Sequence, residues 1–139
     1  MNTTNKVDDF LYENLSYKIR GCIFAVYNNL GFGHKEDIYQ KALALELKNA
    51  NLNFSQQTSL SIIYQDNKIG TYRPDFIIDD KIILEIKAVP FMPKSYETQL
   101  TYYLKGTNFK LGFIINFGDK KLDIRRRVWT PKKKSAEIS

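Results

Sequence analysis

Residues 71–89 read Thr-Tyr-Arg-Pro-Asp-Phe-Ile-Ile-Asp-Asp-Lys-Ile-Ile-Leu-Glu-Ile-Lys-Ala-Val. The two apolar runs in this segment, 76–78 and 82–84, are rich in β-branched residues, which favour strands. The polar residues between them, 79–81, begin with two aspartates, which are typical of tight turns. The segment therefore predicts a β-hairpin.

The turn sets which side chains of the hairpin face one another. With a three-residue loop, Ile78 faces Ile82, and counting outward from that pair places Asp75 opposite Glu85. Directly opposed residues have Cβ atoms about 4.5–5.5 Å apart on one face of a sheet. Because side chains alternate along a strand, Lys87 shares that face with Glu85. We expect two carboxylates and one ammonium to converge.

Two opposed carboxylates repel each other, and partial burial strengthens the repulsion. A divalent cation removes this cost, and carboxylate oxygens suit Mg²⁺ or Mn²⁺. We therefore predict that Asp75 and Glu85 bind metal and that Lys87 orients a water molecule or stabilises charge on a phosphate. The alternative is a hairpin with an ordinary Glu-Lys surface.

Composition indicates one globular domain. The 139 residues are 43% hydrophobic and 26% charged, so we expect residues 1–131 to form a single domain and residues 132–139 a basic, disordered tail. No apolar run of membrane-spanning length occurs, and the first residues lack the apolar core of a signal peptide. Cys22 is the only cysteine, which excludes an intramolecular disulfide and fits a reducing cytoplasm.

The formal net charge of +6 is unevenly distributed. Residues 104–139 carry ten Lys/Arg and three Asp/Glu, whereas the chain before them is close to neutral. A basic block favours a polyanionic partner, with nucleic acid ahead of a membrane surface. Within it, Arg125 and Arg127 are candidate phosphate contacts. A charged edge strand that prevents aggregation, followed by a solubilising tail, is the alternative.

Apolar periodicity predicts two helices, then strands, a third helix and two further strands. The first helix begins at Asp8 or Asp9, and its apolar face includes Ile19, Cys22 and Val26. The expected ranges are about 9–30 and 34–50 for the first two helices, 54–64, 68–78 and 82–87 for strands, 94–105 for the third helix, and 109–117 and 122–129 for the last strands. This order suits one mixed sheet flanked by helices.

Three short motifs resemble those of known nucleases. Pro74-Asp75 followed by Glu85-Ile86-Lys87 resembles the motif of the PD-(D/E)xK nuclease superfamily. The segment 33–39, Gly-His-Lys-Glu-Asp-Ile-Tyr, is similar to the pattern of the GxxExxY family, a compact branch of that superfamily. The resemblance spans about residues 15–127. It implies a restriction-endonuclease-like core of order ααβββαββ.

The resemblance also implies roles for particular residues. Glu36 is expected to be catalytic and, with the Ile86 backbone carbonyl, to add metal ligands to Asp75 and Glu85. Gln99 and Tyr103 resemble the Gln-x-x-x-Tyr motif of RecB-like nucleases, whose residues contact nucleic acid or order the active-site lysine. A surface glutamine and a core tyrosine on one helix are the simpler account.

These observations predict a Mg²⁺- or Mn²⁺-dependent nuclease that hydrolyses phosphodiester bonds of nucleic acid, and we expect DNA, ahead of RNA, as the substrate. The alternative is a non-catalytic or partner-dependent nucleic-acid-binding protein that retains the fold. The chain carries no obvious clamp, helicase or specificity domain, so a protein partner or self-association is part of this alternative.

Overall fold

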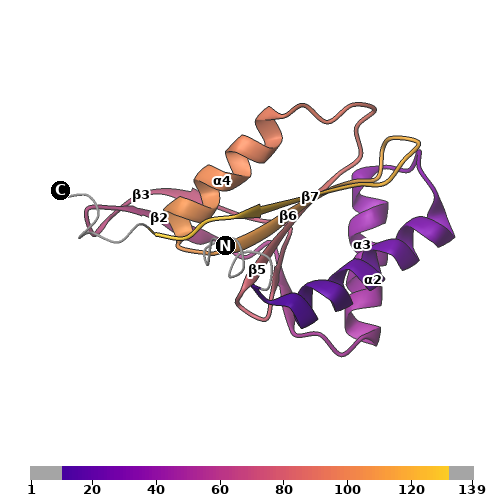
Figure 1. The fold of residues 1–139 in the computed structure, drawn as a ribbon, viewed down its shortest axis with the longest axis horizontal. Helices are drawn as coiled ribbons and strands as arrows, with labels where there is room; N and C mark the ends of the chain where they lie inside the picture. The colour runs from indigo at the N-terminus through magenta and orange to yellow at the C-terminus, as the bar shows by residue number, and fades with distance from the viewer. Residues whose placement is uncertain (1–10, 132–139) are drawn as a thin grey trace, which may run out of the picture.

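The fold is described for residues 11–131 of a computed structural model (Figure 1). Three helices and seven strands follow one another in these residues. Their bounds are α2 (Glu13–Leu30), α3 (Glu36–Asn49), β1 (Phe54–Gln56), β2 (Leu60–Tyr64), β3 (Asn67–Tyr72), β4 (Phe76–Ile78), β5 (Ile82–Lys87), α4 (Ser95–Thr107), β6 (Leu111–Asn116) and β7 (Asp123–Val128). No helix in this part of the chain is both long and apolar enough to cross a membrane.

Five strands form a mixed sheet in the order β1-β4-β5-β6-β7. The central pair, β5 and β6, is parallel, and the other neighbouring pairs are antiparallel. Parallel neighbours need a crossover connection, and α4 supplies it. The predicted mixed sheet flanked by helices is therefore confirmed.

Helices cover both faces of this sheet (Figure 1). On one face, α2 and α3 pack on a core that includes Phe76, Leu84 and Phe113. On the other face, Leu100 and Leu104 of α4 pack in a cluster with sheet residues that include Ile83 and Ile114. The residues that alternate with the first core set, including Glu85 and Lys87, thus lie on the α4 face.

The apolar stripe predicted for α2 is confirmed, because Ile19, Cys22 and Val26 are buried. The predicted start of this helix, at Asp8 or Asp9, lies outside the described residues.

Apolar residues on two adjacent stripes predict a broad buried face for α3, and this prediction was partly wrong. Tyr39, Leu43 and Leu47 are fully buried, but Ile38 and Leu45 are 40% and 63% exposed. One stripe is enough for α3 to pack against α2 and β5, and the neighbouring stripe faces outward.

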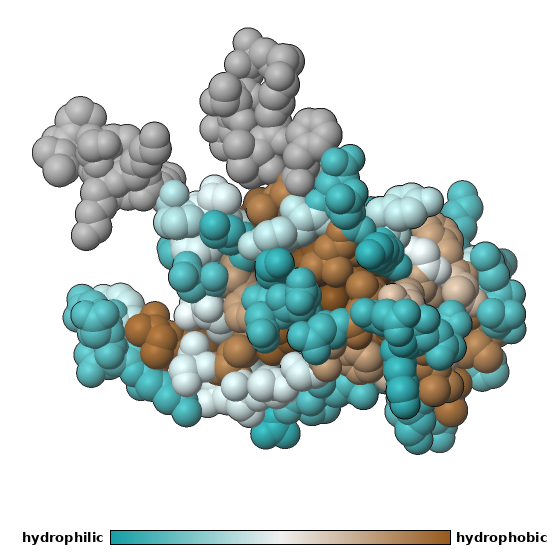
Figure 2. All heavy atoms as spheres, turned by 90° about the horizontal axis from the view of Figure 1, so that it is seen from below, coloured by the Kyte–Doolittle hydropathy of each residue, from teal (hydrophilic) through white to brown (hydrophobic). Residues whose placement is uncertain are grey.

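The two long strands predicted at 54–64 and 68–78 are each interrupted. Gln56 pairs with Phe76 and Leu60 pairs with Tyr72, so both chains skip three residues and resume in the same register. Pro74, which cannot donate a ladder hydrogen bond and is therefore expected at an unpaired position, lies in this gap. Beyond the gap, β2 and β3 form a separate two-stranded sheet that projects from the body (Figures 1 and 2).

Gly118 lies just after β6, where the backbone passes very close to the segment that follows β5. A Cβ atom at this position would overlap Val89 N and the Ala88 carbonyl carbon, which are backbone atoms that cannot move aside as a side chain can. By contrast, a Cβ at Gly21, exposed in the middle of α2, would meet nothing within 4 Å.

We expect Gly118→Ala to lower the free energy of unfolding by about 3 kcal/mol, because the overlap forces the two segments apart. Gly21→Ala is the matched control and should stabilise the protein by up to about 1 kcal/mol, since alanine favours a helix interior. Urea unfolding of both variants measures the two effects. Equal stability of the two variants would show that the segments are not held together as described.

Candidate active site

Asp75 and Glu85 oppose each other across the β4–β5 hairpin. Ile78 pairs with Ile82 and Phe76 with Leu84, as predicted, so Asp75 stands one step beyond the ladder and opposite Glu85. Glu85 Oε1 accepts a hydrogen bond from Asp75 N–H at 3.0 Å, and Asp75 Oδ2 accepts one from Ile86 N–H at 2.7 Å. Each carboxylate is thus held in place by the backbone of the opposite strand.

Burial makes both acids hard to ionise. It raises the pKa of Glu85 to about 7, and the charge of Asp75 adds to this rise. The pKa of Asp75 is also raised by burial, although the hydrogen bonds from Ile86 N–H and from Gln57 oppose the change. The ammonium of Lys87 acts against the shift at both carboxyl groups. The pair therefore carries unfavourable charge that one lysine offsets only in part.

Lys87 ends β5 and lies two residues after Glu85 on the α4 face. Its Nζ lies over the Tyr96 ring, 5.1 Å from the ring centroid, so the first turn of α4 helps to place the ammonium. The two carboxylates and the ammonium predicted to converge therefore do so.

Glu36 reaches the same site from α3, as its first residue. Burial raises the pKa of Glu36, the charge of Asp75 adds to the rise, and Lys87 opposes it, so the three charges interact. The segment before Glu36 is fixed by Tyr39, whose hydroxyl donates a hydrogen bond to Gly31 O at 2.6 Å and accepts one from His34 N–H at 3.2 Å. Gly33 has a φ of 108°, which disfavours any side chain.

The Tyr39 ring also joins α3 to the end of β5. It stacks on Phe117 with centroids 4.5 Å apart and an interplanar angle of 6°. Phe117 N–H in turn donates a hydrogen bond to Lys87 O at 2.9 Å. In the 33–39 motif, the glycine thus provides a positive φ, the glutamate places a charge at the site, and the tyrosine anchors the segment.

Gln99 and Tyr103 connect to the site through Tyr72. Gln99 Nε2 donates a hydrogen bond to Tyr103 Oη at 3.3 Å, and the Tyr103 ring stacks on Tyr72 with centroids 3.8 Å apart. The buried Tyr72 hydroxyl approaches Glu85 closely enough to lower its pKa, but it forms no hydrogen bond of good geometry within residues 11–131. No role for Tyr72 was predicted from the sequence.

The donor set fits a hard divalent cation. Asp75 and Glu85 supply oxygen ligands, their like charges are poorly compensated, and each keeps acceptor capacity beyond its bond to the backbone. In the described part of the chain, no group of three or more His, Cys, Asp and Glu side chains is arranged to hold a metal ion. A cation here would therefore rely on two carboxylates, supplemented by water and phosphate oxygens, as Mg²⁺ commonly does.

Arg125 and Arg127 form ion pairs with a buried acid. Register places both on the face that carries Glu85, because Ile114 pairs with Glu85 on one side and with Arg125 on the other. Arg125 Nη1 lies 2.6 Å from Glu97 Oε1, and Arg127 also contacts Glu97, which is only 8% exposed. Sequence reasoning missed Glu97, which gave no signal beyond its place in a helical pattern.

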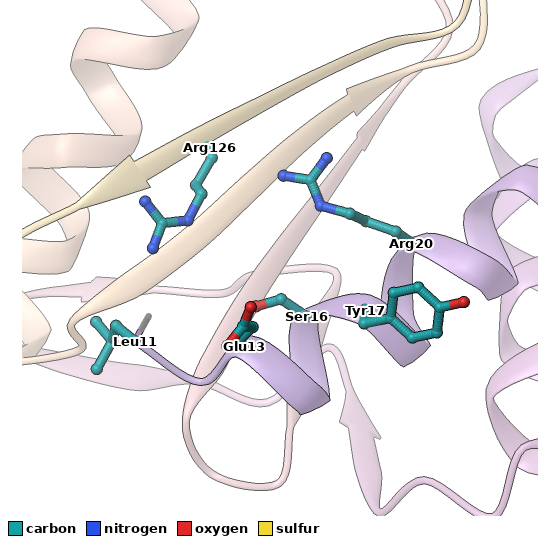
Figure 3. Close-up of a pocket in the computed structure, with 6 residues that line it drawn as sticks. All are labelled: Leu11, Glu13, Ser16, Tyr17, Arg20 and Arg126. Atoms are coloured by element: carbon teal, nitrogen blue, oxygen red, sulfur yellow. The ribbon is translucent and has the colours of Figure 1, made fainter. Parts of the chain in front are cut away.

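A separate pocket of about 330 Å³ lies between α2 and β7 (Figure 3). Arg20 and Arg126 extend into it from opposite sides, and Ser16 lies beneath them. Arg126 alternates with Arg125 and Arg127 along β7, so this pocket is on the α2 face, across the sheet from Glu85. It is not part of the carboxylate site.

The model of the PD-(D/E)XK nuclease superfamily matches residues 13–127. A crystal structure of a protein named SSO0001 shares the fold, with a TM-score of 0.51 and 21% sequence identity over 73% of this chain. This chain covers 53% of the chain in that structure, so it spans about half its length. No curated protein matches the chain. With the match covering most of the chain, and with its carboxylates and lysine on adjacent strands, this protein belongs to the PD-(D/E)XK nuclease superfamily.

Proposed function

We propose that this protein is a divalent-metal-dependent nuclease of the GxxExxY branch and that it hydrolyses DNA in preference to RNA. The observation that carries the proposal is the opposed pair Asp75 and Glu85, partly buried, with Lys87 on the same face. Proteins of this superfamily are generally nucleases and typically use divalent metal ions, and nucleic acid is their substrate. Mg²⁺ or Mn²⁺ suits the oxygen ligands.

The carboxylates would hold the metal and Lys87 would act on the reacting groups. Asp75 and Glu85 are the proposed ligands, with the Ile86 carbonyl beside them on β5. Glu36, predicted as a further ligand, is not grouped with them to hold a metal, and from the start of α3 it would act on Asp75 through its charge. When bound, the metal would supply Lewis-acid stabilisation of charge on the phosphate and a water of lowered pKa. The half-buried Lys87 ammonium is placed to orient the attacking water or to neutralise a phosphate oxygen in the transition state.

Charge supports a nucleic acid substrate, but the structure changes which basic residues are proposed to contact it. The predicted contribution of residues 132–139 lies outside the described residues. Arg125 and Arg127 are already paired with Glu97, which favours a role in holding α4 against β7 over contact with phosphates. Tyr103 and Gln99, which is exposed on α4, remain candidates for substrate contact. Tyr103 stacks on Tyr72 beside Glu85, and Gln99 bonds to Tyr103.

Glu85 should make stability depend on pH when no metal is present. Its pKa of about 7 in the folded protein lies above the ordinary value near 4.5, so the folded state binds the proton more tightly. The contribution of Glu85 to the free energy of unfolding is therefore complete below about pH 4.5. It is lost as the pH rises to 7. The loss should be at most on the order of 3 kcal/mol. Urea unfolding in EDTA at pH 5 and pH 8 measures it.

Glu85→Gln is the control, because its amide oxygen can still accept the Asp75 N–H bond. This variant should show little of that pH dependence. Mn²⁺ should restore stability at pH 8 to wild-type protein and not to Glu85→Gln or Asp75→Asn, whereas both variants should lose nuclease activity. Equal Mn²⁺ affinity in wild-type protein and Asp75→Asn would exclude this pair as the metal site.

Lys87→Met should remove the catalytic charge while keeping the apolar stem that lies against Tyr96. We expect the turnover of labelled DNA to fall by at least about 100-fold, equivalent to about 3 kcal/mol of transition-state stabilisation. Affinity for Mn²⁺, measured by calorimetry, should stay the same or rise, because a nearby positive charge is lost. Wild-type turnover in this variant near neutral pH would rule out the assigned role.

Glu97→Gln should test whether Arg125 and Arg127 serve the fold. Removing the shared buried partner of two guanidinium groups should lower the free energy of unfolding by about 3 kcal/mol. Asp37→Asn, which breaks an exposed pair with Lys41, is the matched control and should cost less than about 1 kcal/mol. Chemical unfolding measures both. A cost below about 1 kcal/mol for Glu97→Gln would show that pairing with Glu97 contributes little to the fold.

The proposed activity is tested with labelled single-stranded, duplex, flap and four-way-junction DNA and with matched RNA, each with and without Mn²⁺. Metal-dependent cleavage that requires Glu85 supports the proposal. Binding without cleavage under all conditions would favour a non-catalytic nucleic-acid-binding protein.

A further inference from the structure

We propose that Phe91 stacks on an unpaired base of the substrate strand, so that the site acts on single-stranded or frayed nucleic acid. This inference rests on the proposed nuclease function and deepens it by naming the substrate class. Phe91 lies in the loop that joins β5, which ends in Lys87, to α4. Its side chain is 75% exposed, whereas the next residue, Met92, is 3% exposed.

Exposure alone would not single out Phe91, because Tyr17 and Tyr102 are similarly exposed on helices. What distinguishes Phe91 is a loop that is held firmly on both sides of it. Pro90 and Pro93 restrict the backbone dihedrals near the ring. A phenylalanine that does not pack, on a backbone that has little freedom, is suited to contact a flat apolar group from outside.

A buried amide fixes the start of this loop. Asn116, 1% exposed at the end of β6, forms two hydrogen bonds with the backbone of Val89. Val89 N–H donates to Asn116 Oδ1 at 3.0 Å, and Asn116 Nδ2 donates to Val89 O at 2.9 Å. Gly118 N–H also donates to Asn116 Oδ1, at 3.0 Å. The residue two positions before Phe91 is therefore tied to the central sheet.

Packing fixes the other side of the loop and places it beside the carboxylate site. Met92 is buried in the cluster that contains Tyr72, whose hydroxyl approaches Glu85. Tyr96 N–H donates a hydrogen bond to Pro93 O at 3.2 Å as α4 begins. The residue next to Phe91 thus belongs to the same buried cluster as Tyr72, which adjoins Glu85.

Phe91 is close enough to Lys87 along the chain for its ring to meet a nucleotide near the cleaved phosphate. It follows Lys87 by four positions, so the two Cα atoms are at most about 14 Å apart. Stacked bases rise about 3.4 Å per step, so the ring would meet a base within about four nucleotides of the phosphate at the site. In a closed duplex the faces of these bases are covered by their neighbours, so stacking requires an unpaired or frayed base.

Charge around the loop favours an anionic partner over a neutral or basic one. Between residues 86 and 96 the chain carries Lys87 and Lys94 and no acidic residue. Cationic groups next to an exposed aromatic ring are the combination by which proteins bind single strands, with the cations near phosphates and the ring against a base. An unpaired nucleobase is therefore the proposed partner of Phe91.

The test uses the full chain in EDTA, which prevents metal-dependent cleavage, and short single-stranded DNA carrying 2-aminopurine at successive positions. Stacking on Phe91 should quench the probe at one or two positions. Phe91→Ala should remove this quenching and weaken single-strand binding by about 5- to 150-fold, the range for loss of one stacked base. Phe91→Trp should retain both the quenching and the affinity. An abasic nucleotide at the quenched position should weaken binding by wild-type protein and by Phe91→Trp, but not by Phe91→Ala.

Tyr17→Ala is the matched control, because Tyr17 is 79% exposed on α2, which covers the opposite face of the sheet. It should change neither quenching nor affinity. The inference is overturned if Phe91→Ala binds single strands as wild-type protein does. It is overturned equally if Phe91→Ala weakens binding to blunt duplex as much as binding to single strands. It is also overturned if Phe91→Ala mainly dissociates a dimer in sedimentation, because the ring would then serve a protein interface.

These measurements separate the inference from the proposed activity. Position-specific quenching that requires Phe91 supports stacking even if no metal brings about cleavage, in which case the nuclease proposal alone fails. Cleavage that requires Glu85 but is unchanged in rate and strand preference by Phe91→Ala overturns the stacking proposal and leaves the nuclease intact.

Discussion

The gap in strand pairing at Pro74 is the constraint on which the site depends. Strand β1 pairs with β4 and strand β2 pairs with β3, in the same register on both sides of the gap. Without the gap, the two pairs would form one continuous ladder. Because pairing stops there, Asp75 can direct its carboxylate to Ile86 N–H and offer its own N–H to Glu85. A proline that cannot join a ladder thus produces two reciprocal bonds across the active-site hairpin.

The cost of this arrangement is electrostatic. Asp75 and Glu85 lose hydration and face like charge, which raises the pKa of Glu85 most, and Lys87 compensates only in part. Structural ion pairs are normally neutralised within the protein, as Glu97 is by two arginines. The contrast between the two clusters is informative. Glu97 and Asp123 together balance the two arginines, and this cluster helps to hold α4 on the sheet, whereas the hairpin pair retains an excess of negative charge.

Two aromatic stacks connect the helices to the hairpin. On one face, Tyr39 of α3 stacks on Phe117, which bonds to the backbone of Lys87. On the other face, Tyr103 of α4 stacks on Tyr72, next to Glu85. Flat rings in contact leave few alternative arrangements, so each helix is held in a defined position relative to the charges. This explains why tyrosines recur in the motifs although none of them carries charge at the site.

Local patterns were enough to predict much of this protein. Alternation and the turn at Asp79-Asp80 indicated the register that opposes Asp75 and Glu85, because a hairpin's pairing depends only on its own residues. Helical periodicity located α2 and α4 for the same reason. The superfamily, too, was recognisable from the hairpin motif and the segment that holds Glu36. These features depend on contacts between residues close in sequence.

Tertiary structure alone decided the rest, because it depends on contacts between distant residues. Nothing local reveals that Glu97 would meet Arg125 and Arg127, which lie 28 and 30 positions later. Two other features likewise follow from which elements become neighbours. They are the interruption of both paired strands at the same place and the exposure of Ile38 and Leu45 on α3. The sequence determined which residues carry the chemistry of the hairpin, and the packing of the helices on two faces of the sheet decided which of the other charges are free to join them.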